Sequence, residues 1–118
     1  MARVVCEDGG YRLPYIPDAI TNDDVNHLRA FFGNAAVAIG LNRANAQSSW
    51  VWETPSPPAN KNLGAYQNWH PQNVVSSNDR KVFMDYSADG TWYTELETHA
   101  PAGYIICQDT NGRQEILE

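Results

Sequence analysis

Several signatures of membrane-spanning and nucleic-acid-binding proteins are missing from this sequence. No apolar run approaches the roughly 18 residues that a membrane-crossing helix needs, and the segment MARVVCEDGG has neither the apolar core nor the length of a signal peptide. Basic residues are scarce, because 8 Lys and Arg stand against 14 Asp and Glu, and the net charge of -6 repels a phosphate backbone. The composition therefore argues against a membrane-spanning segment in this chain and against a nucleic-acid partner.

Catalytic motifs are absent as well. The sequence holds no GxSxG, Walker A, GxGxxG or HExxH motif, which removes the usual support for esterase, nucleotide-binding and metalloprotease activity. Its three histidines, His27, His70 and His99, are isolated from one another. An enzyme that used His70 or His99 would need a nucleophile that the sequence does not show. We therefore predict that the chain is not an enzyme and keep a hydrolase as a remote alternative.

Cysteine is limited to two residues, Cys6 and Cys107, one near each end of the chain. No CxxC is present, so the sequence supports neither a zinc ribbon nor a thioredoxin-like redox motif. A disulfide between the two would enclose nearly the whole chain and, by chain-entropy arguments, would stabilise it by about 4 to 5 kcal/mol. Two buried reduced thiols are the alternative, and the residues alone leave both open.

One short amphipathic helix is predicted to begin at Thr21 or Asn22, which can cap it, and to end before Gly33. Its apolar face would consist of Val25, Leu28, Phe31 and Phe32.

Short apolar or alternating runs predict strands at 35–42, 48–54, 80–86, 91–96 and 103–109. The Asp89-Gly90 turn would join two of them in an antiparallel hairpin. Residues 1–118 thus form a single α+β domain with mostly antiparallel pairing, and its tail at 110–118 is predicted to be frayed.

The segment 55–79 is a long loop, rich in Pro, Gly, Asn and Ser, inside this small domain. Loops of such length are uncommon and usually functional or disordered. The large side chains of Leu63, Tyr66 and Trp69 favour an ordered loop. From Pro55 to Asn78 the loop contains no carboxylate, so a Ca²⁺ site built from it alone would be weak.

The order of these motifs resembles the C-type lectin-like domain family over roughly Cys6 to Gln108. The run Ala38-Ile39-Gly40-Leu41 stands at the family's WIGL motif, Trp50 and Trp52 at its W-x-W strand, Trp69 at its loop tryptophan and Trp92 at the tryptophan after the turn. The resemblance implies a C-type lectin-like fold of small antiparallel sheets with one clear helix and a long ordered loop. It also implies a Cys6–Cys107 disulfide and an extracellular or secreted location.

The sequence departs from the family pattern in two structural respects. The family's second disulfide is missing, and the first strand and most of the first helix are expected to be absent, either because the sequence is truncated or because this is a shortened variant. A shortened domain of this kind would expose a sheet edge, which predicts possible self-association.

A third departure concerns the metal. Sugar-binding members of the family hold Ca²⁺ with a Glu-Pro-Asn or Gln-Pro-Asp tripeptide in the long loop, whose proline is cis, and with a Trp-Asn-Asp motif on the following strand. Here these places read His70-Pro71-Gln72 and Trp92-Tyr93-Thr94, without a carboxylate. We therefore predict a recognition module that binds a protein or glycan ligand through the long-loop face, without a metal or other cofactor and with a cis peptide bond before Pro71 as a structural test.

The predicted ligand-binding residues are Trp69, His70, Gln72, Asn73, Tyr93 and Glu95. For Trp69 a packing role in the loop is the alternative. A calcium-dependent lectin is the alternative function, with Gln72, Asn73, Glu95 and Asp79 as the metal ligands.

Overall fold

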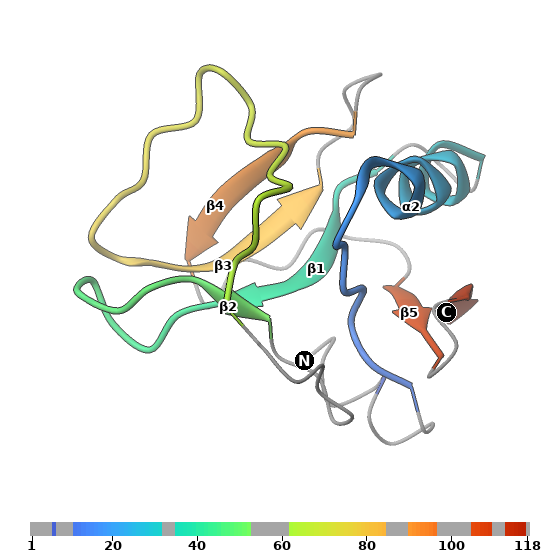
Figure 1. Ribbon diagram of the computed structural model, residues 1–118, viewed down its shortest axis with the longest axis horizontal. Coiled ribbons are helices and arrows are strands. Elements are labelled where there is room, and N and C mark those ends of the chain that lie inside the picture. Colours follow the sequence, from blue (N-terminus) through green and yellow to red (C-terminus); the bar gives the residue numbers. More distant parts are fainter. Residues whose placement is uncertain are drawn as a thin grey trace.

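The computed structural model describes residue 6 and residues 11–31, 35–52, 62–84, 90–96, 105–109 and 113–117, with the backbone alone described at 116 and 117. Helix α2 runs over Ala19–Phe31 (Figure 1). The strands are β1 (Val37–Asn42), β2 (Val51–Trp52), β3 (Asp79–Met84), β4 (Trp92–Leu96), β5 (Ile105–Gln108) and β6 (Gln114–Leu117). No helix within these ranges is long and apolar enough to cross a membrane.

The strands form two antiparallel sheets, a four-stranded one in the order β2-β1-β3-β4 and a two-stranded one of β5 and β6. The predicted hairpin is confirmed, because Met84 of β3 lies opposite Trp92 of β4. Figure 1 shows β4 and the long loop on one side of the molecule and α2, β5 and β6 on the other. The predicted α+β class with mostly antiparallel pairing is therefore confirmed.

Helix α2 begins at Ala19, so the predicted start at Thr21 or Asn22 is wrong. The cap is Asp18, whose Oδ1 accepts a hydrogen bond of 2.8 Å from the backbone N–H of Thr21. This bond holds the pKa of the Asp18 carboxyl below its ordinary value. Asn22 is thereby released from capping and is buried inside the fold.

The buried face of α2 consists of Asn22, Val25, Asn26 and Arg29, which follow helical spacing. Phe31 was predicted on this face but is 81% exposed. Phe31 is six residues after Val25, and at about 3.6 residues per turn this spacing places it on a different side of the helix from the buried stripe. Phe32 lies outside the described residues.

The core lies between α2 and the four-stranded sheet and is built around two tryptophans. The rings of Trp52 and Trp92 meet edge to face at 5.9 Å, and both are buried. The indole N–H of Trp92 donates to Asn22 Oδ1 at 2.8 Å, which ties β4 to the helix. Gly90, just before β4, has a φ of 62°, and a Cβ there would meet Asn26 Cβ at 2.9 Å, so this position requires glycine.

Residues 114–117 form a strand, so the predicted frayed tail is wrong for them. Ile106 of β5 pairs with Ile116 of β6. Asp109 and Arg113 close the hairpin, because Asp109 N donates to Arg113 O at 2.9 Å and Asp109 Oδ1 accepts from Arg113 N at 2.9 Å. Backbone pairing with β5 thus holds the C-terminal residues in the sheet.

Strand β5 is also fixed from two further directions. On its other side, Arg12 and Gln108 exchange backbone hydrogen bonds of 2.9 and 2.7 Å. The predicted disulfide is confirmed: Cys6 and Cys107 are joined, with a Cα–Cα distance of 5.6 Å, and both are buried. On the side away from β6, the described residues pair with β5 at Gln108 alone, so the exposed sheet edge and the self-association both stay predictions.

Candidate functional site

The long loop lies along the outer edge of β4. Trp92 N donates to Asn68 O at 2.9 Å, and His70 N donates to Trp92 O at 3.0 Å. Trp69 therefore forms a parallel bridge with Trp92. Backbone pairing of this kind orders a loop as a strand would, which confirms the prediction of an ordered loop for residues 62–78.

Trp69 is half-buried between two other tryptophans. Its ring lies 5.5 Å from that of Trp92 in an edge-to-face arrangement and 6.1 Å from that of Trp50. Its indole N–H donates to Gln67 Oε1 at 2.9 Å. These contacts give Trp69 the packing role that was the alternative to ligand contact.

Next to Trp69, residues 70–73 make a tight turn. His70 O accepts from Asn73 N at 2.9 Å, which places Pro71 at the second position of the turn, where a trans proline is favoured. The predicted cis bond before Pro71 is wrong, because the described residues contain no cis peptide bond. A cis proline suits the third position of a turn instead.

The His70 imidazole stabilises this turn and stacks on β4. Its Nδ1 accepts a hydrogen bond of 3.0 Å from Gln72 N. The ring stacks on Tyr93, with the ring centres 4.6 Å apart and the planes at 25°. The neutral ring therefore carries its proton on Nε2, which leaves that nitrogen as a donor.

The side-chain oxygens of Asn73 and Asp79 converge on Thr94 of β4. Asn73 Oδ1 accepts from Thr94 N at 3.0 Å, and Asp79 Oδ2 accepts from the Thr94 hydroxyl at 2.7 Å. The same oxygen of Asp79 accepts from Ser76 N at 2.8 Å. Asp79 and Thr94 are each 6% exposed. The threonine thus fills by hydrogen bonds a place where sugar-binding relatives would use a carboxylate.

Alternation along β4 separates Glu95 from these oxygens. Trp92 and Thr94 are buried, whereas Tyr93 and Glu95 are half-buried on the opposite face of the strand. Glu95 lies opposite Lys81 of β3. Of the predicted site residues, Asn73 therefore lies on the Thr94 side, whereas Tyr93, with His70 stacked on it, and Glu95 lie on the other side.

The alternative calcium ligands do not converge in this arrangement. Asn73 and Asp79 already engage Thr94, and Glu95 points from the other face of β4. In the part of the chain that the structure describes, no group of three or more His, Cys, Asp or Glu side chains is placed to hold a metal ion. These residues do not fit a Ca²⁺ ion, which needs several oxygen ligands and gains affinity from charged ones.

Two arginines that sequence reasoning missed hold the end of the loop. Arg43 donates from Nε to Asp79 O at 2.9 Å and from Nη2 to Ser76 O at 2.8 Å. Arg80 Nη1 donates to Ser77 O at 2.7 Å and to Asp79 O at 2.8 Å. The guanidinium of Arg43 also lies over the ring of Trp50, at 4.7 Å. The contacts of Arg43 could not be predicted from a local motif, because Asp79 and Ser76 lie 36 and 33 residues further along the chain.

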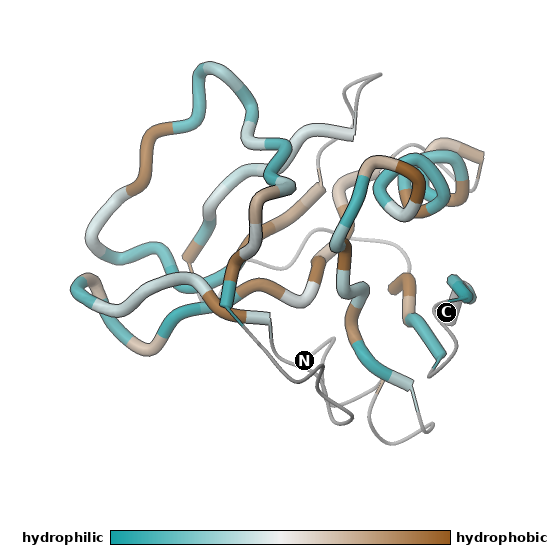
Figure 2. The backbone as a smooth tube through the Cα atoms, viewed as in Figure 1, coloured by the Kyte–Doolittle hydropathy of each residue, from teal (hydrophilic) through white to brown (hydrophobic). Residues whose placement is uncertain are grey.

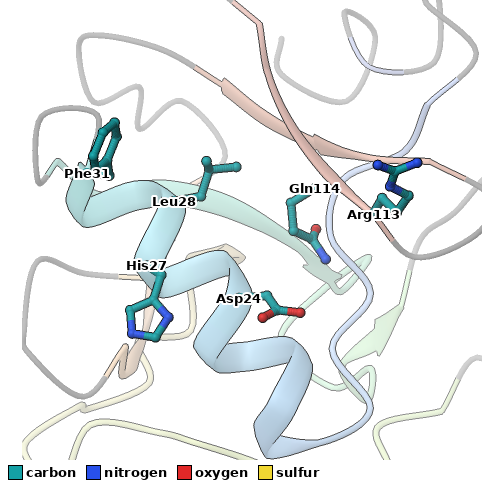
Figure 3. Close-up of a pocket in the computed structure, with 6 residues that line it drawn as sticks. All are labelled: Asp24, His27, Leu28, Phe31, Arg113 and Gln114. Atoms are coloured by element: carbon teal, nitrogen blue, oxygen red, sulfur yellow. The ribbon is translucent and has the colours of Figure 1, made fainter.

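A shallow hollow lies on the other side of the molecule, between α2 and the start of β6 (Figure 3). Its volume is about 520 Å³, and it is lined by Asp24, His27, Leu28, Phe31, Arg113 and Gln114. Leu28 and Gln114 are half-buried, and the other four are exposed. No predicted ligand-binding residue belongs to this hollow.

Comparison with known proteins identifies the fold. The sequence profile of the lectin C-type domain matches residues 1–109, whereas no curated protein matches the chain. Among solved structures, a calcium-independent type II antifreeze protein is 21% identical with a TM-score of 0.66, over 85% of this chain and 69% of that chain. The carbohydrate-recognition domain of cow CD23, solved in the presence of an oligosaccharide, is 25% identical with a TM-score of 0.60, over 80% of this chain and 67% of that chain.

A third structure, the carbohydrate-recognition domain of the mouse scavenger receptor C-type lectin, is 19% identical with a TM-score of 0.62, over 85% of this chain and 71% of that chain. The C-type lectin-like fold implied by the sequence motifs is therefore confirmed. Domains with this fold are generally not enzymes, and they are commonly extracellular or secreted. By its profile match and its fold, this chain belongs to the C-type lectin domain family.

Proposed function

We propose that this domain is a non-catalytic recognition module that binds its ligand through the long-loop face without calcium. The observation that carries the proposal is the pair of hydrogen bonds from Thr94 to Asn73 and Asp79. These bonds join the long loop to β4 directly. A metal ion that bridged the same two elements would have to displace them.

The chemistry of the neighbouring residues supports the same proposal. His70 offers the loop a nitrogen that already accepts from Gln72 N, and Gln72 offers only a neutral amide. Ca²⁺ takes oxygen ligands, and its affinity depends on how many of them are charged. The antifreeze protein that shares this fold is itself described as calcium-independent, and at 21% identity the likeness shows a common fold.

The contact surface that we propose consists of the six predicted residues along the edge where the long loop meets β4, with the rings of His70 and Tyr93 stacked on each other and Gln72 exposed. Their aromatic, imidazole and amide groups are typical of recognition surfaces. The ligand would be a protein or a glycan, and the domain would act outside the cell, where its disulfide persists.

The calcium-dependent alternative is weaker because Glu95, the carboxylate that it would recruit, is on the opposite face of β4 from Thr94, where Asn73 and Asp79 are bound. A hydrolase is weaker still. The His70 imidazole accepts from Gln72 N and stacks on Tyr93, and within the described ranges it makes no hydrogen bond to a serine, threonine or cysteine that it could activate; His99 lies outside the described residues.

A glycan array probed in Ca²⁺ and in EDTA tests the proposal, together with calorimetric titration of Ca²⁺. We expect no heat of Ca²⁺ binding, and any glycan signal should persist in EDTA. Tyr93→Ser should abolish such a signal, whereas Arg113→Ala in the hollow on the other side should leave it unchanged. An EDTA-sensitive signal, or a melting temperature that Ca²⁺ raises, would refute calcium independence.

A further inference from the structure

The long loop presents two exposed valines between its anchored ends. Val74 is 83% exposed and Val75 is 48% exposed. Figure 2 shows the corresponding hydrophobic stretch on the outward side of the loop, between hydrophilic segments. Single exposed apolar residues are common on protein surfaces. Exposure alone therefore does not indicate a binding role for the two valines, and the hydrogen bonds on either side of them are the relevant evidence.

Both ends of the valine pair are fixed by hydrogen bonds. On one side Asn73 is bound to Thr94. On the other side Ser76 is bound through its N–H to Asp79 Oδ2 and through its carbonyl to Arg43. The valines are therefore displayed on an ordered segment, and a ligand would not have to order it, which favours binding.

Leu96 is a third exposed aliphatic side chain, and it is linked to the loop through Asp79, which pairs with Leu96 and binds Ser76 N. It is 47% exposed and lies opposite Asp79 in the β3–β4 pairing. By strand alternation its side chain is on the same face of β4 as that of Thr94, which is the face that the loop anchors occupy. Val74, Val75 and Leu96 together are called the aliphatic patch below.

Arg80 supplies a cationic group at the edge of the aliphatic patch. Its Nη1 binds the carbonyls of Ser77 and Asp79, two residues that follow the valines. Its Nε and Nη2 make no hydrogen bond within the ranges that the structure describes. These N–H groups could bind a carboxylate, and guanidinium–carboxylate pairs are among the stronger polar contacts.

We infer that the ligand of the long-loop face is a polypeptide, which places an aliphatic or aromatic side chain on the aliphatic patch and a neighbouring carboxylate on Arg80. A protein partner gains from burying such apolar side chains, typically at the centre of an interface. A glycan gains much less from them, because its surface is dominated by hydroxyl groups that need hydrogen-bonding partners. This inference rests on the proposed function and selects between its two ligand classes.

The test is selection of a displayed library of random short peptides against the whole domain in EDTA. We expect enriched peptides with Leu, Ile, Val or Phe next to Asp or Glu. Changing the acidic residue of such a peptide to its amide should weaken binding about tenfold or more, which corresponds to about 1.4 kcal/mol. The double variant Val74→Ser and Val75→Ser should weaken binding to a similar or greater extent.

Ile20→Ser is the matched control, since Ile20 is 75% exposed on α2, away from the loop. It should bind the peptides as the wild type does. The inference is overturned if no peptide is enriched, if the valine variant binds equally well, or if the enriched peptides lack the apolar-acidic pattern. A calcium-independent glycan signal together with a failed peptide selection would overturn this inference alone, whereas an EDTA-sensitive glycan signal would overturn the proposed function.

Discussion

The hydroxyl of Thr94 donates a hydrogen bond of 2.7 Å to Oδ2 of Asp79, and both residues are 6% exposed. A buried carboxylate is tolerated only when hydrogen bonds replace its lost hydration. The bond therefore does two things, because it stabilises the charge of Asp79 and it fastens the end of the long loop to β4.

Replacing Thr94 by valine keeps the shape of the side chain and removes this donor. We expect Thr94→Val to lower the free energy of unfolding by about 1 to 3 kcal/mol, because Asp79 would lose a partner in a buried site. Urea denaturation measures the change. Thr94→Ser keeps the hydroxyl and should retain most of the stability. Equal stability of Thr94→Val and the wild type would show that the bond contributes nothing.

Removing the side chain of Asn73 should loosen the loop locally. In Asn73→Ala the backbone N–H of Thr94 loses its acceptor, so its amide should exchange with solvent about tenfold faster or more, in line with about 1.4 kcal/mol for the lost bond. Hydrogen exchange followed by NMR measures this. Asn78→Ala is the control, because the loop bond at Asn78 uses its backbone N–H. Unchanged exchange at Thr94 would contradict the role assigned to Asn73.

Two glycines offer a matched test of backbone geometry. Gly90 has a φ of 62° and leaves no room for a Cβ beside Asn26, whereas nothing lies within 4 Å of a Cβ at Gly64. We expect Gly90→Ala to destabilise the domain by about 1 to 3 kcal/mol and Gly64→Ala to have little effect. Thermal or urea unfolding of the two variants decides this. Similar stabilities would mean that the turn before β4 can relax.

Tyr66 should make the domain sensitive to alkaline pH. Its phenol has a pKa above the ordinary value of 10.0, mainly because it is partly buried and also because of the negative charges of Asp23 and Asp18. The pKa of Tyr66 is thus higher in the folded chain than in the unfolded chain. The contribution of its neutral phenol to folding stability is therefore complete below pH 10 and is lost as the pH rises through the folded pKa. The loss should be smaller in Tyr66→Phe, as measured by melting temperatures across this range. Identical pH profiles of the two proteins would exclude the effect.

The sequence predicted best what local pattern determines. The β3–β4 hairpin follows from two alternating runs and a glycine turn, and β1 from a short apolar run between turn residues. The disulfide required the family resemblance, because two cysteines alone do not reveal whether they meet.

The missed features depend on contacts between distant residues. The bonds of Arg43 to Ser76 and of Thr94 to Asp79 join segments whose proximity no local rule gives. The tail was predicted to be frayed because its pairing with β5 is a tertiary effect, although Asn111-Gly112 is a known hairpin signal. The start of α2 was missed because Asp18, rather than Thr21, provides the cap.

A single carbonyl group joins three parts of the molecule. Gly90 O accepts from Asn22 Nδ2 on α2 at 3.2 Å and from Asn68 Nδ2 on the long loop at 3.0 Å, and Gly90 itself leads into β4. A force that pulled on the loop would therefore load the helix and the sheet at the same time. The long loop is therefore coupled rigidly to α2 and β4 at Gly90, and a force applied by a bound partner would be transmitted to both elements.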